Sequence, residues 1–119
     1  MKYIFVCNYG INRSPTGARV AREMGLEREI DLKTEHMALF PEETPEYEEK
    51  DRKRLEDSDK IFVMTSDIQE IVRKRYKVPN GDMICLDIED NYSLSGLAGP
   101  RMKRMLEEIF RKKLDEWIK

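Results

Sequence analysis

The sequence predicts an α/β protein in which short buried strands alternate with amphipathic helices. Apolar runs rich in aromatic and β-branched residues occur at 3–6 and 60–64, and each precedes a turn or capping signal and then apolar residues at helical spacing. Strands that are apolar throughout are buried on both faces, as in a parallel sheet covered by helices. We therefore expect a parallel sheet with helices on both faces, and ligand binding beyond the carboxyl ends of its strands.

The first third of the chain predicts a strand, a loop, a helix and a second strand. After the apolar run 3–6, Ser14 is suited to cap a helix and Pro15 to occupy its first position, and this helix should end near Gly25. Polar and apolar residues alternate over 29–34. This alternation predicts a more exposed strand at an edge of the sheet.

The middle of the chain predicts a charged helix and a second strand-to-helix unit. Thr44-Pro45 is a plausible start for a charged helix toward Leu55. The run 60–64 predicts a buried strand, and Ser66 and Gln69 have the spacing of a capping box for the helix that follows.

The last third predicts a turn at 79–81, a strand at 83–86, a loop at 90–99 and a long helix from Pro100. The helix should pack on the sheet through a broad apolar stripe. The residues of this stripe recur at steps of three and four: Met102, Met105, Leu106, Ile109, Phe110, Leu114 and Trp117.

Length and composition predict one domain over 1–119. Twenty-two Lys and Arg nearly balance 24 Asp and Glu, so neither a nucleic acid nor a membrane is expected as a partner. No apolar stretch approaches a membrane span, and the first residues run into a strand pattern instead of a signal peptide. We expect a cytoplasmic monomer or weak dimer. With two cysteines and one histidine, we expect neither a metal site nor a cofactor.

The loop Cys7-Asn8-Tyr9-Gly10-Ile11-Asn12-Arg13-Ser14 carries the candidate chemistry. A loop that curls into a helix N-terminus presents unpaired N–H groups and a partial positive charge, which together suit a phosphate. Arg13 can clamp the phosphate with two parallel hydrogen bonds. The same positive field favours the thiolate form of Cys7.

A thiolate beneath a bound phosphate is placed for in-line attack, which gives a phosphocysteine and expels the substrate's oxygen. The departing oxygen needs a proton, so the reaction requires a carboxylic acid at the same rim. The loop after the strand at 83–86 offers Asp87, Glu89 and Asp90.

These motifs resemble the low-molecular-weight protein-tyrosine phosphatases, whose signature is C-x5-R-S-P after the first strand and an Asp-Pro-Tyr turn late in the chain. The likeness spans most of the sequence. It implies a flavodoxin-like three-layer sandwich with a four-stranded parallel sheet in the order 2-1-3-4. It also implies a metal-independent phosphatase acting on a phosphotyrosine protein or a small aryl phosphate.

The resemblance assigns roles to individual residues. Cys7 corresponds to the nucleophile, Arg13 to the phosphate clamp and Ser14 to the hydroxyl that hydrogen-bonds the thiolate. Asp90 corresponds to the general acid, with Asp87 as its rival, and Tyr92 is a candidate wall of the aryl pocket. The residues expected to surround the substrate are Asn8, Tyr9, Gly10, Ile11, Asn12 and Tyr92.

Three residues depart from the family pattern. Asn91 replaces the proline of the acid-bearing turn, Gly10 occupies the place of the loop-bracing asparagine, and Asn12 stands where many members carry a second cysteine. A disulfide that protects Cys7 from within this loop is therefore impossible. The ending Asn-Arg-Ser-Pro resembles a divergent prokaryotic branch of the superfamily.

Three alternatives remain open. A phosphate-binding or interaction module would keep the phosphate site without turnover. An arsenate reductase would need further cysteines, and Cys85, which we expect to be inert core, is the other thiol. A phosphocysteine carrier would not need Arg13 and the acid-bearing loop. Tyr9, Phe40 and Tyr47 are further candidates to line the entrance.

Overall fold

The computed structural model describes residues 1–8, 13–40, 45–89 and 100–119. In these residues four parallel strands form one sheet in the order β2-β1-β3-β4, as the resemblance implied. The strands are β1 (Lys2–Cys7), β2 (Lys33–Ala38), β3 (Lys60–Val63) and β4 (Met83–Cys85).

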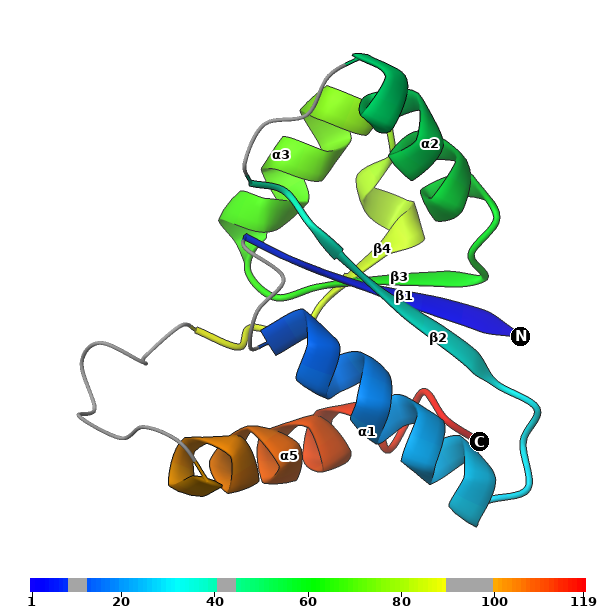
Figure 1. Cartoon of the computed structure of the whole chain (residues 1–119), viewed down its shortest axis with the longest axis vertical. Helices are drawn as coiled ribbons and strands as arrows, with labels where there is room; N and C mark the ends of the chain where they lie inside the picture. The colour runs from blue at the N-terminus through cyan, green and yellow to red at the C-terminus, as the bar shows by residue number, and fades with distance from the viewer. Residues whose placement is uncertain (9–12, 41–44, 90–99) are drawn as a thin grey trace.

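Helices cover both faces of the sheet, which confirms the three-layer α/β architecture. Figure 1 shows α1 and α5 on one side of the strands and α2 and α3 on the other. The helices are α1 (Arg13–Glu27), α2 (Pro45–Glu56), α3 (Ser66–Tyr76) and α5 (Pro100–Leu114), with a 3-10 turn η1 (Asn80–Asp82) before β4.

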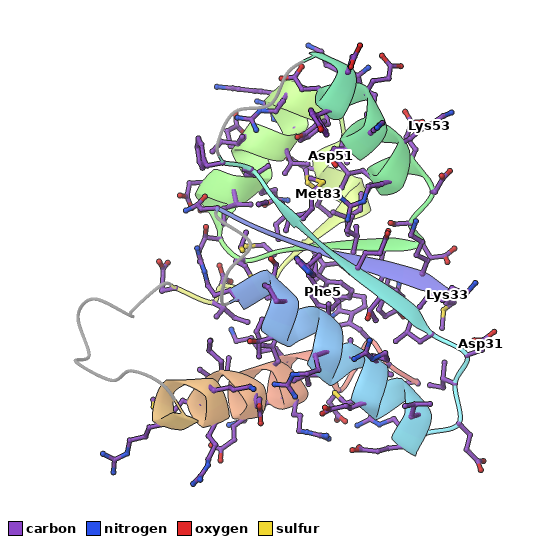
Figure 2. The ribbon with its side chains drawn as sticks, viewed as in Figure 1. Phe5, Asp31, Lys33, Asp51, Lys53 and Met83 are labelled. Atoms are coloured by element: carbon purple, nitrogen blue, oxygen red, sulfur yellow. The ribbon has the colours of Figure 1, made fainter. Side chains whose placement is uncertain are left out.

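An aromatic cluster joins the sheet to the layer of α1 and α5. Phe5 stacks on Phe62 with ring centroids 4.9 Å apart. The Phe110 ring of α5 lies edge-on to the Phe5 ring, with centroids 6.3 Å apart. Figure 2 shows Phe5 on the side of α1, and Met83 on the side of α2 and α3. A Cβ on Gly17 would lie 2.7 Å from the Phe110 ring and 2.8 Å from the Phe5 ring, so α1 approaches the sheet closely because this position lacks a side chain.

The second strand lies later in the chain than its alternating pattern predicted. The sequence placed it at 29–34, whereas β2 spans Lys33–Ala38 and residues 28 and 29 form a turn. Glu29 has a φ of 58°, and the backbone N–H of Ile30 closes the turn on the Gly25 carbonyl at 2.8 Å. The position of β2 at the edge of the sheet was predicted correctly.

Both helix starts nearest the candidate site differ from the predictions. Ser14 is the second residue of α1, which begins at Arg13, so Ser14 lies inside the helix instead of capping it. For α3 the N-cap is Thr65, and Ser66 is the first helical residue. The Ser14 hydroxyl contacts the Cys7 sulfur instead, and the hydroxyl of the N-cap residue Thr65 contacts the Asp67 side chain.

The apolar stripe of α5 is narrower than predicted. Met105 and Ile109 are 45% and 37% exposed, and α5 ends at Leu114. Trp117 therefore lies beyond the helix, where its ring meets Phe62 edge-on at 6.3 Å. The residues of α5 and the following segment that enter the core are Leu106, Phe110, Leu114 and Ile118.

The predicted loop at 90–99 and the helix start at Thr44 fall outside the described residues. In the described part of the chain, no helix is both long and apolar enough to span a membrane.

Candidate active site

The candidate site lies at the carboxyl ends of β1, β3 and β4. The pairing of Val6 with Val63, and of Val63 with Cys85, brings these three strand ends to one edge of the sheet. β1 is a central strand between β2 and β3, and Cys7 at its last position is paired with Ala38 of β2. This edge is where a parallel α/β sheet is expected to bind ligands.

Cys7 and Ser14 meet side chain to side chain. The Cys7 Sγ and the Ser14 Oγ are 2.9 Å apart and hydrogen-bonded, and the two residues are 3% and 0% exposed. Ser14 belongs to the first turn of α1, so the sulfur lies beside the positive end of that helix.

Arg13 is buried at the start of α1 with 6% of its surface exposed. Its guanidinium donates a hydrogen bond of 2.9 Å to the carbonyl of Ile88. The backbone N–H of Ile88 in turn donates to the Met64 carbonyl at 2.7 Å. The segment after β4 is thereby fastened both to the end of β3 and to the cation of the candidate phosphate loop.

Thr65 and Asp67 form a polar pair where β3 gives way to α3. The buried Thr65 hydroxyl donates a short hydrogen bond to the Asp67 carboxylate. This bond holds the pKa of Asp67 below its usual value, and the N–H groups of Asp67 and Ile68 and the charge of Arg13 act in the same direction. Asp67 is therefore a carboxylate at neutral pH.

Asn8, the residue after Cys7, is held from the β2 side. The Asn8 carbonyl accepts hydrogen bonds from the N–H groups of Leu39 at 3.0 Å and Phe40 at 2.7 Å. Arg75 of α3 donates to the Leu39 carbonyl at 2.8 Å, and its guanidinium lies 5.8 Å from the centre of the Phe40 ring. Phe40 thus lies next to the candidate loop, whereas Tyr47 is 57% exposed on α2.

Asp87 adopts a φ of 54° and its side chain is directed toward Cys85. The Cys85 Sγ lies 3.4 Å from its carboxylate oxygen, and both residues line a shallow depression that includes Lys113 of α5. The sequence predicted Cys85 to be enclosed in the core, but it is only half-buried, at the end of β4. Burial raises the pKa of its thiol, and the Asp87 carboxylate adds to that effect, so its inertness remains the expectation.

The structure brings together the described members of the predicted set, which are Cys7, Asn8, Arg13 and Ser14. Glu89 is exposed beyond Ile88. In the described residues, no group of three or more His, Cys, Asp or Glu side chains could hold a metal ion. The predicted residues that lie outside the described ranges are Tyr9, Gly10, Ile11, Asn12, Asp90 and Tyr92.

Sequence reasoning missed Thr65, Asp67 and Arg75. Thr65 and Asp67 directly follow a buried strand, and that position alone could have marked them, because strand ends converge in a parallel sheet. Arg75 had no comparable signal, since it is one of several cations on a charged helix.

Solved structures with a similar fold were found, although the sequence comparisons gave no match. No family model matches the chain, and no curated protein matches it in sequence. Among solved structures it is similar to a low-molecular-weight protein tyrosine phosphatase from T. tengcongensis, with a TM-score of 0.78 and 17% identity over 99% of this chain and 97% of that one. A protein tyrosine phosphatase from Entamoeba histolytica gives a TM-score of 0.72 and 16% identity over 99% and 94%.

An arginine phosphatase from Geobacillus stearothermophilus also aligns, with a TM-score of 0.66 and 14% identity over 98% of this chain and 90% of that one. The chain therefore has the fold of the low-molecular-weight phosphatases along almost its whole length.

Proposed function

We propose that this protein is a metal-independent phosphatase that hydrolyses aryl phosphates, phosphotyrosine in particular, through a phosphocysteine on Cys7. The observation that carries the proposal is the contact of Cys7 with Ser14 at the start of α1, beside the buried Arg13. A hydroxyl, a helix N-terminus and a guanidinium together stabilise a thiolate and attract a phosphate. The likeness in fold to protein tyrosine phosphatases supports the same activity.

In the first step the Cys7 thiolate attacks phosphorus while the bond from phosphorus to the phenolic oxygen breaks. Arg13 and backbone N–H groups stabilise the charge on the transferring phosphoryl oxygens. A carboxylic acid protonates the departing oxygen. In the second step the same group, now a carboxylate, takes a proton from water as the water attacks phosphorus, which releases phosphate and restores the thiolate.

We assign the general acid to Asp90, and Asp87 remains its rival. Asp90 follows Ile88, whose carbonyl accepts the hydrogen bond from Arg13, by two positions in the sequence. Asp87 is less favoured because its carboxylate lies beside Cys85. A protonated acid and an ionised Cys7 together give a bell-shaped pH profile on the acidic side of neutral.

The proposed substrate is a phosphotyrosine protein or a small aryl phosphate in the cytoplasm, and the proposed catalytic unit is the single chain 1–119. Tyr92 is the proposed aryl wall, with loop residues 8–12 around the phosphate. The arginine phosphatase among the structural neighbours makes phosphoarginine the natural comparison substrate.

The test is hydrolysis of p-nitrophenyl phosphate, phosphotyrosine and phosphoarginine without added metal, between about pH 4.5 and 8. We expect turnover of the aryl substrates that Cys7→Ser abolishes and Asp90→Ala weakens. Asp87→Ala serves as the matched control for the acid. Phosphate binding without turnover by the native chain would favour an interaction module, and turnover that survives Cys7→Ser would refute the mechanism.

A further inference from the structure

The start of α5 carries three exposed cations. Arg101, Lys103 and Arg104 are exposed, and the first turn of α5 has no acidic residue. No carboxylate in the described part of the chain forms an ion pair with them, whereas Arg111, near the end of the same helix, pairs with Glu27. Cations in a first turn are repelled by the partial positive charge of the helix N-terminus. These charges therefore do not stabilise the helix that carries them, which points to a role in binding an anionic group.

Two exposed apolar side chains continue the same face of α5. Met105 and Ile109 are 45% and 37% exposed. They follow Arg101 at steps of four residues, so the three side chains lie in line along the helix. Surface Met and Arg are typical of protein–protein interfaces. The surface formed by Arg101, Lys103, Arg104, Met105 and Ile109 is called the basic α5 face below.

The helix α5 runs antiparallel to the strands, so its start lies toward the carboxyl edge of the sheet. Phe110 meets Phe5 of β1, whereas the ring of Trp117, after the end of α5, lies 5.2 Å from the ammonium of Lys60, the first residue of β3. Moving back along α5 from Phe110 therefore leads toward the carboxyl ends of the strands. Figure 1 shows α5 beginning on the side of the molecule where β1 ends.

The dimensions of the helix and the strand place the basic α5 face at the level of Cys7 and beyond it. The helix rises about 9 Å between Arg104 and Phe110, and about 13 Å between Arg101 and Phe110. The strand rises about 7 Å between Phe5 and Cys7. A protein substrate with its phosphate at Cys7 extends away from the sheet on this side. The residues beside its phosphotyrosine therefore lie on the same side of the molecule as the basic α5 face.

The opposite layer carries the opposite charge at the same edge. The helix α2 ends at Glu56, shortly before β3 begins at Lys60, so α2 also runs antiparallel to the strands and starts toward the carboxyl edge. Its first turn contains Glu46 and Glu48. A negatively charged segment is therefore attracted to the α5 side and repelled from the α2 side, which gives a substrate one favoured orientation.

We propose that the basic α5 face binds an acidic segment of the phosphorylated protein substrate, beside the phosphotyrosine whose phosphate Cys7 attacks. The inference rests on the proposed function, because it names the class of protein that the catalytic centre dephosphorylates. The three cations attract acidic side chains of the segment, and Met105 and Ile109 contact its apolar residues. These contacts lower KM for substrates that carry negative charge next to the phosphotyrosine.

An anionic membrane is the other partner that a basic and apolar helix face can bind. Two acidic residues, Glu107 and Glu108, follow shortly after the cations and reduce the attraction to a lipid surface. A membrane partner would also not explain why the face lies at the carboxyl edge. A protein substrate explains both the charge and the position, and anionic vesicles form a separate arm of the test.

The experiment measures the binding of two fluorescent phosphotyrosine peptides to the full Cys7→Ser chain by fluorescence anisotropy. One peptide has glutamate and leucine on both sides of the phosphotyrosine, and the other has glutamine in place of glutamate. Cys7→Ser removes the thiolate so that the peptides stay intact, and Cys7→Ala replaces it if that chain does not fold. We expect the acidic peptide to bind about three- to tenfold more tightly, with a preference that weakens as salt rises.

The test variant adds Arg101→Gln, Lys103→Gln and Arg104→Gln, and its preference for the acidic peptide should fall below about twofold. The matched control removes three exposed cations from the opposite end of α5 and the segment after it, which are Lys112, Lys113 and Lys119. Glutamine replaces each of them, so both chains have the same net charge. The control should keep the preference, because its substitutions lie toward the amino edge of the sheet.

Loss of the preference in the test variant alone is the expected result. Equal binding of the two peptides, or an equal loss in both triple variants, would overturn the inference. Binding of phosphatidylserine vesicles that only the test variant loses, without a peptide preference, would assign the face to a membrane instead. Hydrolysis of p-nitrophenyl phosphate by the native chain tests the proposed function separately, because this substrate has no flanking segment. Turnover without a peptide preference would therefore leave the phosphatase proposal intact.

Discussion

Polar side chains are buried at the carboxyl edge of the sheet but largely exposed where α1 packs against α5, a region called the α1–α5 seam below. At the edge, Arg13, Ser14 and Thr65 are 6%, 0% and 7% exposed, and each has a specific partner within reach. At the seam, Arg111 pairs with Glu27 at 2.8 Å, but these side chains are 43% and 54% exposed. The ion pair at the seam is thus largely exposed, whereas these three polar side chains at the edge are buried.

This difference shows where a substitution should matter. Exposed ion pairs contribute little because water screens them and ordering long side chains has an entropic cost. Buried polar groups lose far more when a partner is removed, since the remaining group is left without solvation. The edge is therefore expected to govern chemistry, and the seam is expected to have only a small effect on stability.

Arg13→Lys should give the largest effect on turnover. Lysine keeps the charge but cannot form the planar two-point contact with phosphate. We expect kcat/KM for p-nitrophenyl phosphate to fall about 10²- to 10³-fold. Steady-state kinetics measure this, with Arg19→Lys as a control in the α1–α5 seam, and a loss below threefold would remove Arg13 from the role of clamp.

Gly17→Ala should affect folding more than chemistry, because its Cβ would meet the rings of Phe110 and Phe5. Overpacking of this kind costs about 1–3 kcal/mol. Urea unfolding measures the loss, and kcat per folded molecule should stay within about twofold of native. An undiminished free energy of unfolding would show that the contact between α1 and the aromatic cluster has room for a methyl group at position 17.

Arg75→Gln should give a smaller effect on both properties. Its guanidinium donates to the Leu39 carbonyl, and Leu39 and Phe40 in turn bond the Asn8 carbonyl. We expect a loss of about 1 kcal/mol in stability and a fall in kcat/KM of less than about tenfold. Arg73→Gln on the same helix is the control. Equal kinetics for the two variants would show that Arg75 does not position the candidate loop.

Glu27→Gln should give the smallest effect. The hydrogen bond and charge of Arg111 hold the pKa of Glu27 below its usual value. A lowered pKa in the folded state contributes stability above the unfolded value of about 4.3, and the contribution disappears as the pH falls through the folded value. The melting temperatures of variant and native chain should differ slightly at neutral pH and converge in acid, once the pH has fallen below the lowered pKa of Glu27. A difference that persisted in acid would point to lost packing.

The sequence predicted β1 and β3 well because both are buried on two faces and their apolar runs are uninterrupted. It misplaced β2 because an edge strand with one fully buried residue, Met37, has no such run. The short alternation just before β2 was the stronger pattern, but it belongs partly to the turn around Glu29.

The sequence predicted those parts of the candidate site whose residues lie close together along the chain. Cys7, Arg13 and Ser14 lie within one loop and helix start, so their meeting follows from a strand followed by a helix. The contact of Arg13 with Ile88 spans 75 residues and depends on the pairing of three strands.

The central claim is a phosphoryl group covalently bound to Cys7, and trapping it tests that claim most directly. The native chain and Asp90→Ala, which should slow hydrolysis of the intermediate, would be mixed with p-nitrophenyl phosphate and quenched in acid, with Cys7→Ser as the control. Peptide mass spectrometry should find one added phosphoryl group on Cys7, in greater amount in Asp90→Ala. Turnover with an unmodified Cys7 at every quench time, or phosphate on another side chain, would contradict the account.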